Sequence, residues 1–176
     1  KETTMIKLGV NSVLFQGHDL ATAMKHIAMA GYDGIELSAI SGMCEHLVLD
    51  NWRAQKDEIR GLAAEHKLEL LSMEVASLDE TRLIKAFEAG AGIGIPVINI
   101  GPGGKSNEQA DLDKHTDLMA KMADKAASFG VTLCVKAHVG ACDYNTPTTL
   151  FAMKKISSPA FGIDMDPSHI YRANEN

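Results

Sequence analysis

The chain has little cysteine, no excess of basic charge and no long apolar runs. Its three cysteines form no Cys-x-x-Cys pair, which is typical of free thiols in a reducing compartment, so we expect a cytoplasmic protein. No apolar run approaches the roughly 20 residues that span a bilayer, and no membrane partner is expected. A net charge of −6 disfavours nucleic acid as a partner, because phosphate binding needs a basic patch.

What the chain does contain is an alternation of strand-like and helix-like segments. Helix patterns with apolar residues at helical spacing begin at Asp19, Asp50, Asp79 and Thr146, and a further long one ends at Gly130. Strands are predicted before and between them, at residues 6–13, 34–38, 68–75, 96–100, 131–138 and from residue 161 onward. The starts lie about 30 residues apart, which is the length of one βα unit. A chain of 176 residues fits a single domain, residues 1–176.

Strict strand–helix alternation predicts a parallel α/β sheet with right-handed crossovers. A doubly wound open sheet and a TIM barrel both fit, but the regular spacing and the polar strand ends favour the barrel. A closed barrel has eight βα units and about 250 residues. We therefore expect a TIM (β/α)8-type barrel of which this chain holds only the first six βα units, incomplete at its C-terminus.

Polar side chains stand at the predicted carboxyl ends of the strands. Residues two apart on a strand share one face, which places Lys136 with His138 and Asp164 with Asp166. Buried charged groups are usually paired or bound to a metal. Since the active site of a TIM barrel lies at this end of the strands, we expect one pocket lined by these polar residues: Glu36, Glu74, Asn99, Lys136, His138, Asp164, Asp166 and His169.

The motif Met-Asp-Pro-Ser-His at residues 165–169 ends the sixth unit. In that position it resembles the sugar phosphate isomerase/epimerase superfamily, the xylose isomerase-like TIM barrels that include AP endonuclease family 2. Three other segments look like the same family: Ile-Lys-Leu-Gly-Val-Asn (6–11), Gly-Tyr-Asp-Gly-Ile-Glu-Leu-Ser (31–38) and Gly-Val-Thr-Leu-Cys-Val-Lys-Ala-His (130–138). The resemblance covers nearly the whole chain.

The resemblance implies a divalent metal ion (Mn, Mg, Co or Zn) held by carboxylates and imidazoles. It also implies a base that moves a proton next to the carbonyl of a sugar, sugar phosphate or related polyol or keto acid. By this pattern Asp166 is a metal ligand, and His169 lies beside the metal or binds the substrate. A Glu normally ends strand five, where this chain has Lys136. His138 could replace that Glu as a ligand, and the usual ligands from strands seven and eight fall outside these 176 residues.

These considerations give three groups of candidate site residues. They are Lys136, His169 and Glu74 for catalysis, Glu36 and Asn99 for substrate binding, and Asp166 and His138 for the metal ion. Asp166 could instead cap the Pro-Ser-His turn, and Glu36 and Glu74 could equally be buried structural carboxylates. Lys136 could hold a substrate phosphate or carboxylate, form a Schiff base, or pair with Asp164; the ion pair is the simplest of the three.

Two further features indicate structure rather than chemistry. The run Gly-Pro-Gly-Gly-Lys-Ser at residues 101–106 is not a P-loop, because Asn99 stands where that motif needs its first glycine. The remaining histidines fall on predicted helices or loops and are expected to be solvated: His18, His26, His46, His66 and His115.

Two functions compete with a carbohydrate isomerase or epimerase. An endonuclease IV-like DNA-repair hydrolase has the same fold but needs more metal-binding histidines and a basic groove. A non-catalytic truncated barrel would account for Lys136 and for the missing units. The bare edges of strands one and six would favour self-association if these 176 residues were the whole product. We therefore expect a small carbohydrate as the ligand and a homo-oligomer as the assembly.

Overall fold

Six parallel strands lie side by side in the order β1 (Gly9–Asn11), β2 (Gly34–Ile40), β4 (Glu69–Glu74), β5 (Val97–Ile100), β6 (Thr132–Val135) and β7 (Phe161–Ile163). A short strand, β3 (Cys44–Glu45), adds an antiparallel pair to β2. The computed structural model describes residues 6–174. The strands follow chain order across the sheet, as the alternating pattern predicted. This arrangement is an α/β sheet of the TIM-barrel type with six βα units.

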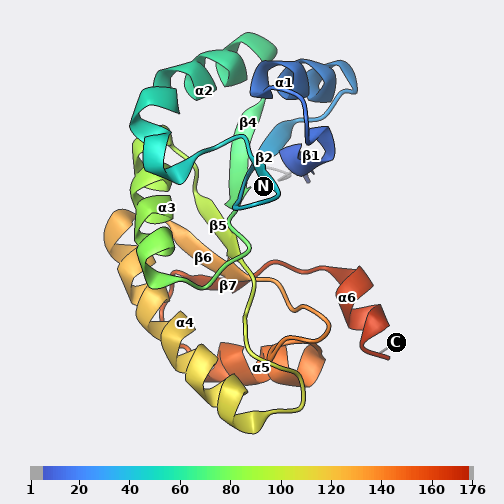
Figure 1. Ribbon diagram of the computed structural model, residues 1–176, viewed down its shortest axis with the longest axis vertical. Coiled ribbons are helices and arrows are strands. Elements are labelled where there is room, and N and C mark those ends of the chain that lie inside the picture. The colour runs from blue at the N-terminus through green and yellow to red at the C-terminus, as the bar shows by residue number, and fades with distance from the viewer. Residues whose placement is uncertain (1–5, 175–176) are drawn as a thin grey trace, which may run out of the picture.

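The helices form an outer arc along the convex side of the sheet (Figure 1). They are α1 (Leu20–Met29), α2 (Trp52–His66), α3 (Glu80–Ile93), α4 (Gln109–Phe129) and α5 (Thr146–Lys155), with the short α6 (Pro167–Arg172) on the open side. Two 3-10 turns, η1 (Ser12–Phe15) and η2 (Leu49–Asn51), precede α1 and α2.

Local capping explains where several helices begin and end. The carboxylates of Asp19 and Asp79 accept hydrogen bonds from the backbone N–H groups of Thr22 and Arg82, as expected for N-caps. Gly94 and Gly130 end α3 and α4 with φ angles of 98° and 73°, a left-handed conformation that glycine adopts without a steric cost.

The predicted helix start at Asp50 is wrong by two residues. Asp50 lies in η2, and its carboxylate pairs with Lys85 of α3 instead of capping a helix. α2 therefore starts at Trp52, and Asn51 before it makes no side-chain cap hydrogen bond. The Asp50 carboxylate therefore makes an ion pair with a neighbouring helix and no N-cap hydrogen bond to α2.

Most strands are shorter than their apolar patterns suggested, whereas β2 runs two residues past the predicted range 34–38. Residues 6–13 were predicted as one strand, but β1 ends at Asn11, whose side-chain oxygen accepts from the N–H of Val13 and starts η1. In the fifth unit β6 ends at Val135. The N–H of Lys136 still donates to Ile100 O (3.0 Å), while His138 already lies in the following loop.

The core lies between the sheet and the helices. Alternate strand residues such as Leu37, Met73 and Leu133 are fully buried, in one hydrophobic cluster with Phe87 of α3 and Met119 of α4. The opposite, concave face carries hydrogen-bonded polar side chains of β2, β4 and β5. This alternation turns every second side chain toward the open side of the arc.

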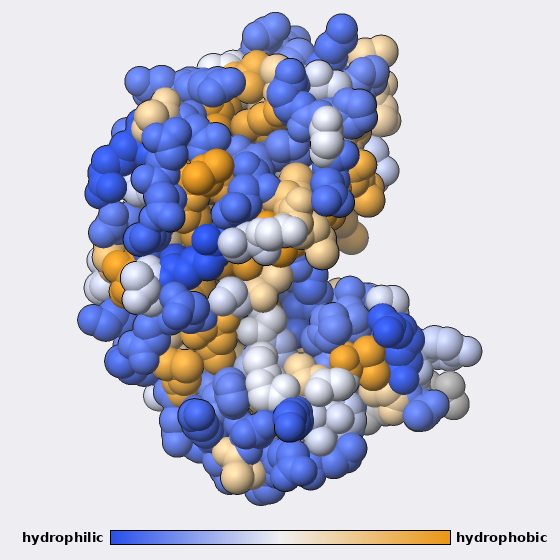
Figure 2. Space-filling view, in the orientation of Figure 1, coloured by the Kyte–Doolittle hydropathy of each residue, from blue (hydrophilic) through white to orange (hydrophobic). Residues whose placement is uncertain are grey.

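The sheet does not close on itself within residues 6–174. β1 and β7 are its two edges, and each has a strand partner on one side only. Apolar side chains near the two edges are exposed, among them Leu8 (60%) and Met165 (69%). Figure 2 shows a hollow on the open side of the arc, between the part that carries β1 and the part that carries α6. Within the same residues, no helix combines the length and apolarity needed to cross a membrane.

Candidate active site at the carboxyl ends of the strands

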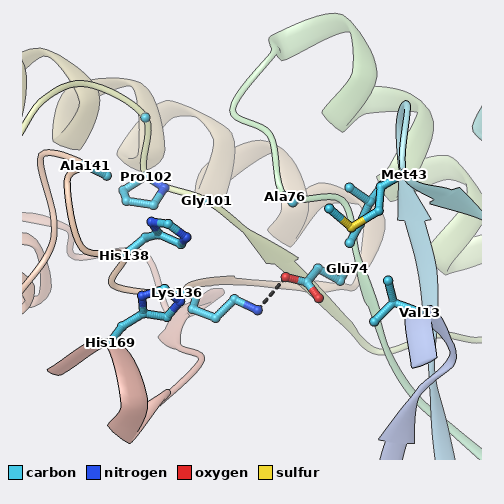
Figure 3. A pocket seen from close by; sticks show the side chains of 12 residues that line it. Val13, Met43, Glu74, Ala76, Gly101, Pro102, Lys136, His138, Ala141 and His169 are labelled. Atoms are coloured by element: carbon cyan, nitrogen blue, oxygen red, sulfur yellow. Dashed lines mark hydrogen bonds and ion pairs between the residues drawn. The ribbon is translucent and has the colours of Figure 1, made fainter. Parts of the chain in front are cut away.

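A cavity of about 470 Å³ opens at the carboxyl ends of the strands. Four side chains with acid–base chemistry line it: Glu74, Lys136, His138 and His169 (Figure 3). The rest of the lining consists of apolar side chains and of the loop at 101–103 after β5. Half of the residues expected in one pocket thus line this cavity. The other half do not: Glu36, Asn99, Asp164 and Asp166.

The Glu74 carboxylate in the cavity wall and the Glu36 carboxylate behind it share a hydrogen-bond network on the concave face. Glu36 Oε1 accepts from Ser72 Oγ (2.9 Å) and Asn99 Nδ2 (2.5 Å). Asn11 Nδ2 bridges the pair, at 2.7 Å from Glu36 Oε2 and 2.6 Å from Glu74 Oε2. Burial raises the pKa of Glu36; the hydrogen bonds from Ser72 and Asn99 offset part of this effect, while the charge of Glu74 adds to it. Glu36 and Asn99 thus lie in a layer that supports Glu74 rather than in the cavity wall.

Lys136 reaches across the sheet to the carboxylates. Its ammonium forms an ion pair with Glu74 and lies 3.7 Å from Asp164 Oδ2. Burial by itself would lower the pKa of Lys136, but the hydrogen bond and charge of Glu74, together with Asp164, raise it above the ordinary value. The ion-pair interpretation is confirmed, with Glu74 as the closer partner. An amine held in its charged form is a poor Schiff-base nucleophile.

The rings of His138 and His169 lie in contact, with centroids 4.0 Å apart and planes tilted by 37°. His138 Nδ1 lies 3.0 Å from the carbonyl oxygen of Val139 and donates to it, so in the neutral ring the lone pair is on Nε2. The N–H of Val139 donates to His169 Nδ1 (3.3 Å), so neutral His169 carries its proton on Nε2. Burial lowers the pKa of His169, and so does the charge of His138 whenever that ring is protonated. The pair therefore offers one acceptor and one donor.

Asp166 caps α6. Its Oδ1 accepts from the N–H (2.9 Å) and the hydroxyl (2.6 Å) of Ser168, and these bonds lower the pKa of Asp166. Its Oδ2 lies 3.8 Å from His169 Nε2. The turn-capping role is thus what the structure shows, and a metal-ligand role for Asp166 stays a prediction.

The family model of the xylose isomerase-like TIM barrel matches residues 24–176. The chain belongs to this family. Among curated proteins no sequence matches it. This family is the one that the motifs at the strand ends of the sequence resemble.

Solved structures share this fold. A probable 3-DHS dehydratase, AsbF, from Bacillus anthracis superposes with a TM-score of 0.80 at 16% identity, over 96% of this chain and 66% of that one. A D-psicose 3-epimerase, solved in the presence of D-fructose, gives 0.79 at 14%, over 97% and 67%. The IolI protein with a bound zinc atom gives 0.78 at 16%, over 97% and 66%. The chain therefore spans about two thirds of the length of these structures, and at such identities the likeness shows the fold alone.

The polar residues of this xylose isomerase-like chain do not fit a complete metal centre. Within residues 6–174 no three His, Cys, Asp or Glu side chains are grouped so that they could hold a metal ion. The two predicted ligands, His138 and Asp166, each contact His169. The ammonium of Lys136 lies beside the carboxylates of Glu74 and Asp164, where a metal ion would otherwise find its oxygen ligands.

Asn11 and His46 also depart from what the sequence predicts. Asn11, which bridges Glu36 and Glu74, was not singled out, although its place at the end of the first strand is the same signal that identified the other site residues. His46 was expected in solvent but is buried: its Nε2 donates to His18 O (2.9 Å), and its Nδ1 lies 3.6 Å from Cys44 Sγ. A satisfied hydrogen-bond pair offsets its loss of hydration.

Proposed function

We propose that this chain forms the pocket of an isomerase or epimerase that acts on a sugar, sugar phosphate or related polyol or keto acid by moving a proton next to a carbonyl group. The observation that supports it is the arrangement of His138 and His169. One imidazole presents a free lone pair and the other an N–H, both beside the ammonium of Lys136. Membership of the xylose isomerase-like family agrees with this chemistry.

Each group then has a defined task. His138 Nε2 takes the proton from the carbon next to the substrate carbonyl, since a neutral imidazole is a suitable base near pH 7. As that proton leaves, negative charge develops on the carbonyl oxygen, to which His169 Nε2–H and the Lys136 ammonium donate hydrogen bonds. Isomerisation follows when the protonated His138 returns the proton to the former carbonyl carbon while the hydroxyl proton of the neighbouring carbon passes to the oxyanion. Epimerisation follows when a water molecule, instead of His138, protonates the original carbon from its other face and His138 gives its proton to solvent.

Glu74 and the layer below it position these groups. Glu74 holds the Lys136 ammonium, and Asn11 fixes the Glu74 carboxylate from the opposite side. Preorganised donors of this kind stabilise a developing oxyanion without having to reorient during the reaction. No step is assigned to a metal ion, because the side chains that would hold one are not grouped within residues 6–174. The substrate is a small carbohydrate-like molecule, and a cytoplasmic location stays a prediction from cysteine use.

Proton exchange with solvent tests this proposal whichever product the reaction forms. A panel of aldoses, ketoses and their phosphates is incubated with the protein in D2O, and deuterium at the carbon next to the carbonyl is measured by NMR. We expect incorporation with at least one substrate, and a loss of about 10²–10⁴-fold in its rate for His138→Gln. His26→Gln is the matched control, because His26 is exposed and stacks on Phe15.

Two results would contradict the assignment. Equal exchange rates for His138→Gln and His26→Gln would remove His138 as the base. Binding of a sugar without any exchange would favour the non-catalytic barrel. Incision of an oligonucleotide that contains an abasic site would favour the endonuclease, which the net charge of −6 disfavours.

A further inference from the structure

Three carboxylates crowd the concave face next to the cavity. Glu36 comes from β2, Glu74 from the end of β4, and Asp164 from the residue after β7. The charge of Glu74 raises the pKa of both Glu36 and Asp164, and burial, the larger cause for each, acts in the same direction. Such a concentration of buried negative charge is unfavourable unless a cation compensates it.

The cation that faces these carboxylates belongs to the chain itself. The Lys136 ammonium contacts Glu74, whose side chain is only 10% exposed, and lies 3.7 Å from Asp164 Oδ2. The backbone holds it there: the N–H of Lys136 donates to Ile100 O (3.0 Å), and that of Asp164 donates to Val135 O (2.9 Å). Figure 3 shows the lysine side chain extended across the cavity toward Glu74. Its position is therefore set by the sheet register.

We infer that Lys136 is a built-in counter-cation that takes the place of a divalent metal ion at Glu74 and Asp164, so that this pocket binds such an ion only when the lysine charge is removed. The physical reason is repulsion between like charges at a few ångströms in a partly buried site. The carboxylate oxygens are themselves suitable ligands for Mn²⁺ or Mg²⁺. This inference concerns cation binding and does not depend on the proposed reaction.

Titration with Mn²⁺ alone tests it on the full chain, after removal of metals with EDTA and dialysis into metal-free buffer at pH 7. Free Mn²⁺ is measured by its EPR signal. Lys136→Glu and Lys136→Met are expected to bind one Mn²⁺ at least about tenfold more tightly than the wild type. Adding Glu74→Gln to Lys136→Met should abolish the gain, because it removes a ligand.

Lys155→Met is the matched control. Lys155 also lies between two carboxylates, 2.8 Å from Asp117 Oδ1 and 3.8 Å from Asp113 Oδ1, but on the outer surface of the protein. Removing its charge should not change Mn²⁺ binding by the pocket. Wild-type protein that binds one Mn²⁺ as tightly as the Lys136 variants would overturn the inference. So would Lys136 variants that bind no more tightly than Lys155→Met.

A measurement on the wild type alone covers the case in which the Lys136 variants do not fold. Paramagnetic Mn²⁺ broadens the NMR signals of nearby nuclei, and His138 and His169 line the same cavity as Lys136. With one equivalent of Mn²⁺, their imidazole signals should stay as sharp as those of the exposed His26. Selective broadening of the two cavity histidines would place a divalent ion beside Lys136 and overturn the inference.

Discussion

Lys136→Met is expected to lower the free energy of unfolding by about 2–4 kcal/mol at pH 7. The substitution keeps most of the apolar stem but leaves the carboxylates of Glu74 and Asp164 without their cation. Breaking a fully buried ion pair costs about 3–5 kcal/mol. The Lys136 and Glu74 side chains are 21% and 10% exposed, so water recovers part of this cost. The remainder is still a large fraction of a typical total of about 5–15 kcal/mol.

Urea unfolding followed by circular dichroism, in EDTA, measures this loss. Lys155→Met supplies the comparison: Asp117, the partner of Lys155, is 69% exposed, and solvent screens such a surface pair so strongly that losing it should change stability little. The difference between wild type and Lys136→Met should shrink as the pH falls, because a protonated Asp164 no longer needs a cation. Two results would refute the reasoning: an equal cost for the two methionine variants, or a cost for Lys136→Met that is the same in acid and at pH 7.

Three further outcomes are expected. Phe87→Ala should cost about 3–5 kcal/mol in thermal or urea unfolding, because its buried ring packs near Phe129, whereas the exposed Leu14→Ala should stay within about 0.5 kcal/mol. Burial raises the pKa of Asp164 above its ordinary value of 3.8, so the folded state favours the protonated carboxyl. This contribution to stability is complete below pH 3.8 and is lost as the pH rises through the folded-state pKa. In urea unfolding at a series of pH values, the free energy of unfolding should therefore decline less with rising pH for Asp164→Asn than for the wild type. The 176-residue chain should self-associate through the open edges β1 and β7, and a monomer in light scattering would contradict this.

The sequence by itself determined the order of the elements and the end of the sheet that carries the site. Strand and helix periodicity, capping residues such as Asp19 and terminal glycines such as Gly130 depend on neighbours within a few residues. These local signals predicted six βα units in a parallel sheet, and the structure has them. The motif at residues 165–169 and three supporting segments pointed to the family, whose model matches residues 24–176.

Only the tertiary structure decided which polar groups meet. Asn11 and Glu74 are separated by 63 residues, and Lys136 and Glu74 by 62, and no local pattern specifies such pairs. Their contacts depend on the register and curvature of neighbouring strands, which bring side chains from β1, β4 and the end of β6 to one concave face. The same packing makes Glu74, and not Asp164, the closer ion-pair partner of Lys136. The polar residues at the strand ends thus predicted a polar site. The fold determined that the lysine ammonium lies among the carboxylates of that site.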